Sequence, residues 1–159
     1  MRKPLVSFVI TLLVIAALLF AVRALIPRFS ASVAQGPVER DGGRRLADCP
    51  ESPNCQGSDS GEAERRVEPL PLKGSADETM DALVALIGAR SDAAVASRDG
   101  DYLHATFTSS LVGYIDDVEF LVDESAGIVR IRSASRIGHS DLGANARRVE
   151  ALREAWTRG

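Results

Sequence analysis

The longest hydrophobic stretch of the chain is residues 5–22, which hold no charged residue, glycine or proline. An α-helix rises about 1.5 Å per residue, so a helix over this stretch is about 27 Å long, close to the hydrocarbon thickness of a bilayer. The apolar surface extends to residue 26 if the Arg23 side chain reaches the interface. We therefore expect a transmembrane helix over residues 5–26, preceded by a short basic N-terminus at residues 1–4.

A cleaved signal peptide is the alternative, because a small-x-small sequence, Ser32-Val33-Ala34, follows the apolar run. The run exceeds the roughly 7–15 apolar residues usual in signal peptides, which favours an uncleaved anchor. Arg2 and Lys3 favour a cytoplasmic N-terminus, whereas the arginines that follow the run favour the opposite orientation. We expect a single-pass protein of the cell membrane, with its N-terminus inside and its soluble domain in the periplasm or another extracytoplasmic space.

Beyond residue 66 the hydrophobic residues recur first at the spacing of a helix and then at every second position, as in a strand. A capping box of Ser75 and Glu78 predicts a helix start, and Gly88 lies near the helix end. Turns at Asp99-Gly100 and before Gly127 predict two β-hairpins. The hairpin strands are expected at 93–98, 102–109, 114–123 and 128–135. The apolar stripe of the first helix is Met80, Leu83, Val84 and Ile87. A second, C-terminal helix is expected to be capped by Ser140 or Asp141, and its apolar stripe is Leu142, Ala146, Val149, Leu152 and Trp156.

These elements predict an α+β domain over residues 66–159 in the order β-α-β-β-β-β-α. The first strand, within residues 66–72, is restricted to a sheet edge by Pro69 and Pro71. Both helical stripes are buried when the two helices lie on one face of a curved antiparallel sheet, in a helix-grip-like arrangement.

Residues 27–65 are rich in glycine and charged residues and show almost no apolar periodicity, which predicts a tether. Cys49 and Cys55, the only cysteines, lie in this segment, and a disulfide closing a small loop is the expected state outside the cytoplasm. A single reactive cysteine, or a copper or haem contact, is the alternative. Two thiols alone cannot complete a tetrahedral zinc site, so we predict no metal site and no cofactor.

Charge limits the partners that this chain can bind. All 22 acidic residues and 16 of the 19 basic residues follow Arg23, so the part beyond the anchor has a net charge of −6. This balance argues against nucleic acid as the partner. Residues 99–124 hold seven acids and no lysine or arginine, whereas residues 128–159 hold seven arginines and three acids.

The second hairpin brings these two blocks of charge together. If Asp123 faces Ile128, then Glu119 faces Arg132 on the side of the sheet away from the helices. One interpretation is a solvated face with cross-strand ion pairs. The other is a groove in which polar side chains converge on a ligand. The side chains expected on this face are Tyr102, His104, Thr106, Thr108, Asp117, Glu119, Leu121, Arg130 and Arg132.

Candidate chemistry is limited to two places. His104 with Glu119 or Asp117 could do general acid–base work, but no Ser/His/Asp order, metal-ligand cluster or phosphate loop accompanies them. His139 is expected in a loop. The second place is an anion site formed by the arginine-rich strand and the start of the last helix, although a helix cap braced by Arg136 is the favoured interpretation of these residues. The candidate ligand- or anion-binding residues are Tyr102, Arg130, Arg132, Ser135, Arg136, Ser140 and Asn145.

Several ordered motifs carry a resemblance to a known family. They are Ser52-Pro53-Asn54-Cys55, Tyr102-Leu103-His104-Ala105, Asp116-Asp117-Val118-Glu119-Phe120, Arg132-Ser133-Ala134-Ser135-Arg136, and Ser140-Asp141-x-Gly143-x-Asn145 with Arg147 and Arg148. Over residues 48–157 the chain resembles the uncharacterised bacterial family domain of unknown function 1499, which has relatives in photosynthetic eukaryotes. It departs from the pattern at Gln56-Gly57-Ser58, where relatives often have Val-Ser-Ser. The resemblance implies an envelope or organelle-lumen setting and no known activity.

Together these observations favour a membrane-anchored extracytoplasmic domain that binds an envelope protein, a lipid or an anionic ligand through its polar sheet face. An envelope enzyme of hydrolase type, using His104 with Glu119 or Asp117, is a less favoured alternative. A structural or assembly factor without a small-molecule site is the third.

Overall fold

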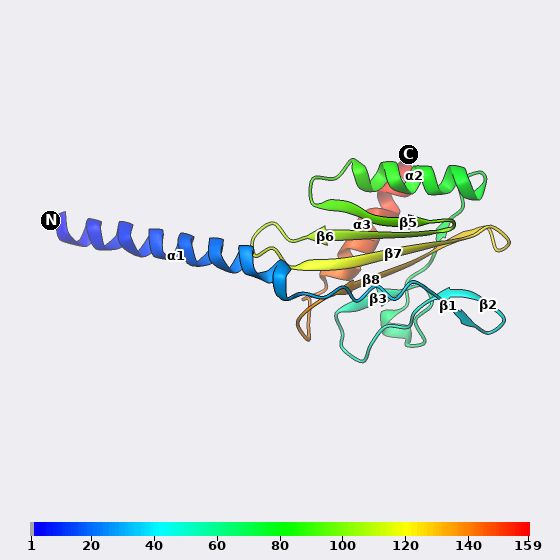
Figure 1. Ribbon diagram of the computed structural model, residues 1–159, viewed down its shortest axis with the longest axis horizontal. Coiled ribbons are helices and arrows are strands. Elements are labelled where there is room, and N and C mark those ends of the chain that lie inside the picture. The colour runs from blue at the N-terminus through cyan, green and yellow to red at the C-terminus, as the bar shows by residue number, and fades with distance from the viewer. Residues whose placement is uncertain (1) are drawn as a thin grey trace.

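The computed structural model describes the backbone of residues 2–159 and the side chains of residues 4–26 and 30–159. Met1, part of the expected basic N-terminus, lies outside the described residues, as do the side chains of residues 2, 3 and 27–29. The apolar run forms helix α1 (Arg2–Phe29), which projects from one end of the molecule (Figure 1). Its segment Pro4–Ile26 is unburied, and is long and apolar enough to be a membrane anchor or a signal sequence.

The rest of the chain forms an open antiparallel sheet with two helices, so the predicted α+β class is confirmed. Four strands make the predicted pair of hairpins, and two short strands from earlier in the chain pair with the last strand. The strands are β3 (Cys55–Gly57), β4 (Leu70–Pro71), β5 (Ala93–Asp99), β6 (Tyr102–Thr108), β7 (Ile115–Asp123) and β8 (Ile128–Ser135), and their order is β3-β8-β7-β6-β5, with β4 also on β8.

The expected register of the second hairpin is confirmed. Asp123 pairs with Ile128, and Glu119 pairs with Arg132. Helix α2 (Ala76–Gly88) also begins as predicted, because Ser75 and Glu78 form the capping box. The edge strand expected near Pro69 is present as β4, although only two residues of it pair.

Helices α2 and α3 (Ala144–Arg158) cover one face of the sheet and enclose the main core. Leu103, Ala105 and Phe107 alternate toward this core from β6, as the sequence predicts. The predicted stripe of α3 is wrong at its start, because Leu142 and Ala146 are exposed. The N-cap is Gly143, at a φ of 78°, so Leu142 precedes the helix and the buried position in the first turn belongs to Asn145.

Residues 27–65, expected to be a tether, contain three strands and lie against the sheet. β1 (Pro37–Arg40) and β2 (Gly43–Leu46) form a separate hairpin, and β3 extends the main sheet. Residues 30–36, called the strap below, connect α1 to this hairpin along the sheet face opposite the helices (Figure 1). Leu46 packs with Tyr102 and Leu121 as a small second core under the hairpin. The central strands β7 and β8 are therefore covered on both faces, whereas β5 is largely exposed.

Candidate functional site

The polar face of the sheet, defined by Tyr102, His104, Asp117, Glu119, Arg130 and Arg132, is held together by three buried ionic groups. In the first, Asp117 has no exposed surface and accepts hydrogen bonds from four residues. The Val33 amide lies 2.7 Å and the Ser32 hydroxyl 3.1 Å from its Oδ2. On its other side, His104 Nε2 lies 2.7 Å and Arg136 Nη2 2.8 Å from Oδ1.

The second group centres on Glu119, which is also fully buried. The backbone amides of Gln35 and Gly36 donate to its Oε1 at 3.1 and 2.9 Å, and the Tyr102 hydroxyl donates to the same oxygen at 2.8 Å. Arg132 Nη1 lies 2.7 Å from Oε2. The two carboxylates of β7 thus hold the strap through three of its backbone amides and through the Ser32 hydroxyl.

Arginine side chains bind the backbone carbonyls of the strap. Arg132 Nη1 donates to the Val33 carbonyl at 3.2 Å, and Arg136 Nη1 donates to the Ser30 carbonyl at 3.3 Å. The strap therefore contributes both donors and acceptors to the ionic network of β7 and β8.

Burial and hydrogen bonding set the proton affinities in this network. Burial raises the pKa of Asp117, but donors from His104, Arg136 and Val33 outweigh it and hold this pKa well below the ordinary range. Burial and the neighbouring charge of Glu119 raise the pKa of Tyr102. The Asp117 carboxylate is therefore charged, and the Tyr102 phenol protonated, across the physiological range.

A third group lies toward the β7–β8 turn. Arg130 bridges Asp59 and Asp123 at 2.6 and 2.7 Å, and Asp59 also accepts the Leu46 amide at 2.9 Å. The hydrogen bond from Arg130, with a further one from the Ser125 hydroxyl, lowers the pKa of Asp123 to about 2. Burial alone lowers the pKa of Arg130, but the two carboxylates outweigh burial and raise it. Asp59 thus links the segment that precedes β4 to strand β8 through its ion pair with Arg130.

The interpretation of a solvated polar face is wrong, because Asp117 and Glu119 are 0% exposed and Arg132 is 2% exposed. The structure brings Glu119 and Arg132 together as an ion pair. The carboxylate that His104 contacts is that of Asp117 and not that of Glu119. The strap occupies the space in which a ligand of the predicted groove would lie. Missing from the sequence prediction were the strap and Asp59, since both sit in the segment that shows no hydrophobic periodicity.

The His104 group is not arranged as a hydrolase triad. In a triad the imidazole stands between the nucleophile and the carboxylate, so that it can accept the hydroxyl proton. Here the Asp117 carboxylate stands between Ser32 and His104. A proton leaving the Ser32 hydroxyl would meet a carboxylate whose pKa is held low, which makes Asp117 a weak base.

The predicted anion site is divided between the two faces of β8, because successive strand residues point in opposite directions. Arg132 and Arg136 face the strap, whereas Ser133 and Ser135 face the α3 side. Asn145 joins them there, accepting from the Ser133 hydroxyl at 2.6 Å and donating to the Ser135 hydroxyl at 3.0 Å.

The remaining partners around the start of α3 also lie within the chain. The Asn145 amide group donates to the Asn54 carbonyl at 2.8 Å, and its backbone amide donates to Asp141 at 2.7 Å. The Ser140 hydroxyl accepts from the Leu142 amide at 3.3 Å. His139 is exposed in the loop, as expected. Asn145 therefore joins α3, β8 and the residue before Cys55.

Cys49 and Cys55 form the predicted disulfide, and Cys55 is fully buried in β3. Within the described part of the chain, no group of three or more His, Cys, Asp or Glu side chains is placed to hold a metal ion. The disulfide therefore accounts for both thiols, and it lies where β3 meets β8.

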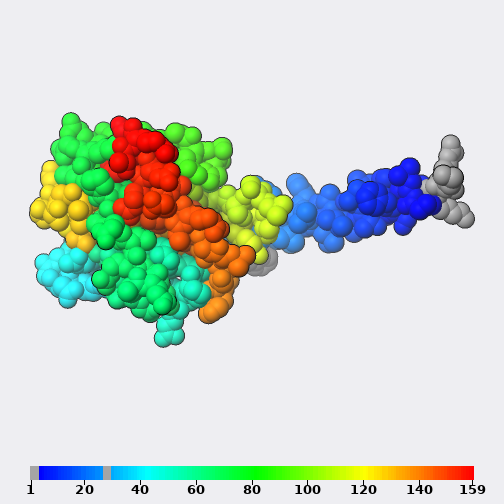
Figure 2. Space-filling view, turned by 180° about the vertical axis from the view of Figure 1, so that it is seen from behind, coloured from blue at the N-terminus to red at the C-terminus, as the bar shows by residue number. Residues whose placement is uncertain are grey.

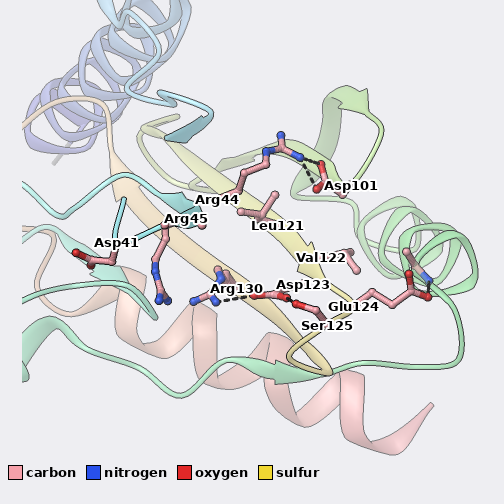
Figure 3. A pocket seen from close by; sticks show the side chains of 13 residues that line it. Asp41, Arg44, Arg45, Asp101, Leu121, Val122, Asp123, Glu124, Ser125 and Arg130 are labelled. Carbon is pink, nitrogen blue, oxygen red and sulfur yellow. Dashed lines mark hydrogen bonds and ion pairs between the residues drawn. The ribbon is translucent and has the colours of Figure 1, made fainter. Parts of the chain in front are cut away.

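The polar face opens to solvent at the end away from α1. A cavity of about 510 Å³ lies there, between the β1–β2 turn and the β7–β8 turn. Figure 3 shows Arg44 reaching Asp101 and Arg130 reaching Asp123 at its walls, with Arg45 extending beside Arg130 on the side of Asp41. Arg45 has a single long ionic contact, 3.5 Å to Asp59, so its charge is the least neutralised of the three arginines. The charged residues of the lining are Asp41, Arg44, Arg45, Asp101, Asp123, Glu124 and Arg130.

A family model described as "Protein of unknown function (DUF1499)" matches residues 45–156, which agrees with the resemblance seen in the motifs. No curated protein and no solved structure shows significant similarity to the chain.

Proposed function

The chain belongs to the DUF1499 family, whose function is unknown, and we propose that it is a membrane-anchored extracytoplasmic module that presents a polar binding cavity at a fixed height above the bilayer. The observation that carries this proposal is the attachment of the strap to Asp117 and Glu119. Helix α1 ends at Phe29 and the strap begins one residue later, so no free linker separates the anchor from the sheet. The anchor and the domain act as one body.

The compartment follows from the cysteines and the anchor. Disulfides persist in oxidising spaces and are rare in the cytoplasm, so the Cys49–Cys55 bond supports an extracytoplasmic domain. With α1 as the span, the N-terminus then lies in the cytoplasm. This is the topology of a single-pass protein of the cell membrane.

The cavity at the far end of the polar face is the binding site in this proposal. Arg45 supplies a cation for a carboxylate or phosphate, since its own partner is 3.5 Å away. The carboxylates of Asp101, Asp123 and Glu124 line the same cavity and suit hydroxyl or amino groups. The ligand class is therefore a small polar molecule, or the polar part of an envelope lipid or protein, that carries both kinds of group.

A structural or assembly role is the second candidate, and the middle of the polar face favours it. Asp117, Glu119 and Arg132 are all paired within the chain, which is the pattern of a face built for stability. The hydrolase alternative has less support, because Asp117 separates Ser32 from His104.

The test is native mass spectrometry of the full chain, purified from membranes into lipid nanodiscs. A non-covalent adduct that is present on the wild-type chain and lost in Arg45→Ala supports the binding proposal. Arg158→Ala is the matched control, because Arg158 is exposed at the far end of α3 and should keep the adduct. If the wild-type chain carries no adduct, the result contradicts the binding proposal and favours an assembly role. Recovery of the chain in the soluble fraction after alkaline extraction would refute the anchor.

A further inference from the structure

Among the described residues beyond α1, few large hydrophobic side chains are exposed, and they are not scattered. Leu111 is 72% exposed and Tyr114 47%, both in the loop between β6 and β7. Ile137 is 37% exposed and Leu142 86%, both in the loop between β8 and α3. Only Val95 lies elsewhere, on β5. Exposed apolar side chains grouped in this way mark an interaction surface.

Both loops lie at the end of the sheet from which α1 leaves. The Arg23 guanidinium donates to the carbonyls of Ser109, at 3.2 Å, and Ser110. Gly113 permits this contact, because a Cβ at its position would lie 3.0 Å from Arg23 Cγ, and its φ of +84° suits glycine. Figure 2 shows the yellow-green 109–114 loop against the blue helix, with the orange segment that precedes α3 at the same end of the domain.

The contact with Arg23 fixes the depth of the first loop. Arg23 lies three residues before the end of the apolar segment at Ile26, which is about 4.5 Å along a helix. If Pro4–Ile26 spans the bilayer, Arg23 lies at the boundary between acyl chains and headgroups, where arginine side chains extend toward water. A loop hydrogen-bonded to Arg23 must lie at that boundary too.

The second loop presents its apolar residue at an energetic cost. Leu142 has a φ of +53°, in the left-handed region that glycine and asparagine tolerate better than leucine. The loop is nevertheless fixed, since Arg147 donates to the Leu142 carbonyl at 2.9 Å and the Ser140 hydroxyl accepts from its amide at 3.3 Å. Strain held at an exposed position points to a contact outside the domain.

We infer that Leu111, Tyr114, Ile137 and Leu142 form a membrane-docking rim that inserts into the headgroup boundary of the bilayer around α1. The inference rests on the membrane anchoring in the proposed function. A lipid surface is the occupant because the rim continues the apolar span of α1 at the depth of Arg23, and because Tyr114 belongs to a residue type enriched at membrane interfaces. The rim would hold the cavity near Arg45, at the opposite ends of the strands, away from the membrane.

The test places a spin label at single introduced cysteines of the full chain in nanodiscs of phosphatidylcholine. The native cysteines are bonded to each other, so only the introduced thiol reacts. Leu111→Cys and Leu142→Cys probe the rim, and Ile15→Cys probes the middle of α1. Ala126→Cys is the matched aqueous control, because Ala126 is exposed in the β7–β8 turn. The readout is the accessibility of each label to oxygen relative to a water-soluble nickel chelate.

We expect this ratio to be several-fold higher at positions 111 and 142 than at position 126. Repeating the measurement in phosphatidylcholine vesicles, which contain no scaffold protein, assigns such a result to contact with lipid. A lipid-exposed label at position 15 with aqueous labels at 111 and 142 would overturn the docking rim and leave the anchor intact. An aqueous label at position 15 would overturn both the anchor and the rim.

Discussion

Glu119 and Arg132 lie directly opposite each other on β7 and β8, with Glu119 Oε2 2.7 Å from Arg132 Nη1, and both side chains are buried. Removing one member of a buried ion pair leaves the other charge without a partner, which costs about 3–5 kcal/mol. We therefore expect Glu119→Gln to lower the free energy of unfolding by about 3 kcal/mol, measured by denaturant titration of the full chain in detergent.

The double variant tests whether the loss comes from the pair itself. Glu119→Gln keeps an oxygen that can accept from Tyr102, so Glu119→Gln with Arg132→Met should cost at least about 1 kcal/mol less than the sum of the two single variants. Strictly additive losses would mean that the two charges do not interact.

The bridge between Arg130 and Asp123 predicts an acid-dependent contribution to stability. The pKa of Asp123 is about 2 in the folded chain and about 4 in an unfolded one, so its contribution is complete above pH 4 and disappears as the pH falls through 2. Asp123→Asn should cost about 1 kcal/mol at pH 7. The difference from the wild type should narrow between pH 4 and pH 2 in denaturant titrations.

The control for this pH series is Glu150→Gln, at a position on α3 whose side chain is 64% exposed. Its unfolding free energy should stay within about 0.5 kcal/mol of the wild type. A deficit of Asp123→Asn that stayed constant down to pH 2 would contradict the assignment of the low pKa to this bridge.

The Cys49–Cys55 bond closes a short loop, for which the loss of unfolded-chain entropy gives a stabilisation of about 2 kcal/mol. Cys49→Ala with Cys55→Ala should therefore unfold at lower denaturant concentration and still reach the same folded structure. Alkylation followed by intact-mass measurement checks the bond directly. Addition of alkyl groups to the unreduced wild-type chain would show that the thiols are free.

The strain at Leu142 predicts a stabilising substitution. Leu142→Gly should raise the free energy of unfolding in detergent by about 1 kcal/mol, because glycine adopts a φ of +53° without steric cost and the lost side chain is 86% exposed. Leu111→Gly is the matched control, since Leu111 is 72% exposed without a positive φ, and it should gain nothing. Equal effects of the two substitutions would argue against strain at position 142.

His104 donates a hydrogen bond to the buried Asp117 carboxylate, so we expect its loss to lower the stability of the fold. His104→Ala should lower the free energy of unfolding by about 1.5–3 kcal/mol, because Asp117 loses a hydrogen bond in the interior. Thr106→Ala, two residues along the same strand and face, is the control and should cost much less. If His104→Ala were as stable as the wild type, the result would contradict a structural role of His104 and favour a catalytic one.

The hairpins and their register could be predicted because the alternation of apolar residues and the position of the turn determine which side chains meet. Glu119 opposite Arg132 follows from the turn before Gly127 alone. The start of α3 could not be placed as well, since Leu142 continues the apolar spacing of the helix although it belongs to the loop.

The burial of the polar face could not be predicted, because most of the donors that the strap contributes are backbone amides, with the Ser32 hydroxyl as a side-chain donor beside them. Every residue except proline carries the same amide, so the bonds from Val33 and Gly36 leave no signature in the sequence. Asp59 was missed for a related reason. Its partner Arg130 lies 71 residues away, and nothing local distinguishes it from other acids of a polar segment.

The strap also determines what happens if the domain is released from the membrane. A protease that cuts after Ala34, where the signal-like sequence ends, detaches Ser32 and Val33 from the Asp117 carboxylate. The shed domain then keeps a buried charge with fewer donors, and a buried group that loses its hydrogen bonds costs about 1–3 kcal/mol. In the anchored protein that we propose, shedding would thereby be coupled to a loss of stability, and we expect a released copy to have a shorter lifetime than an anchored one.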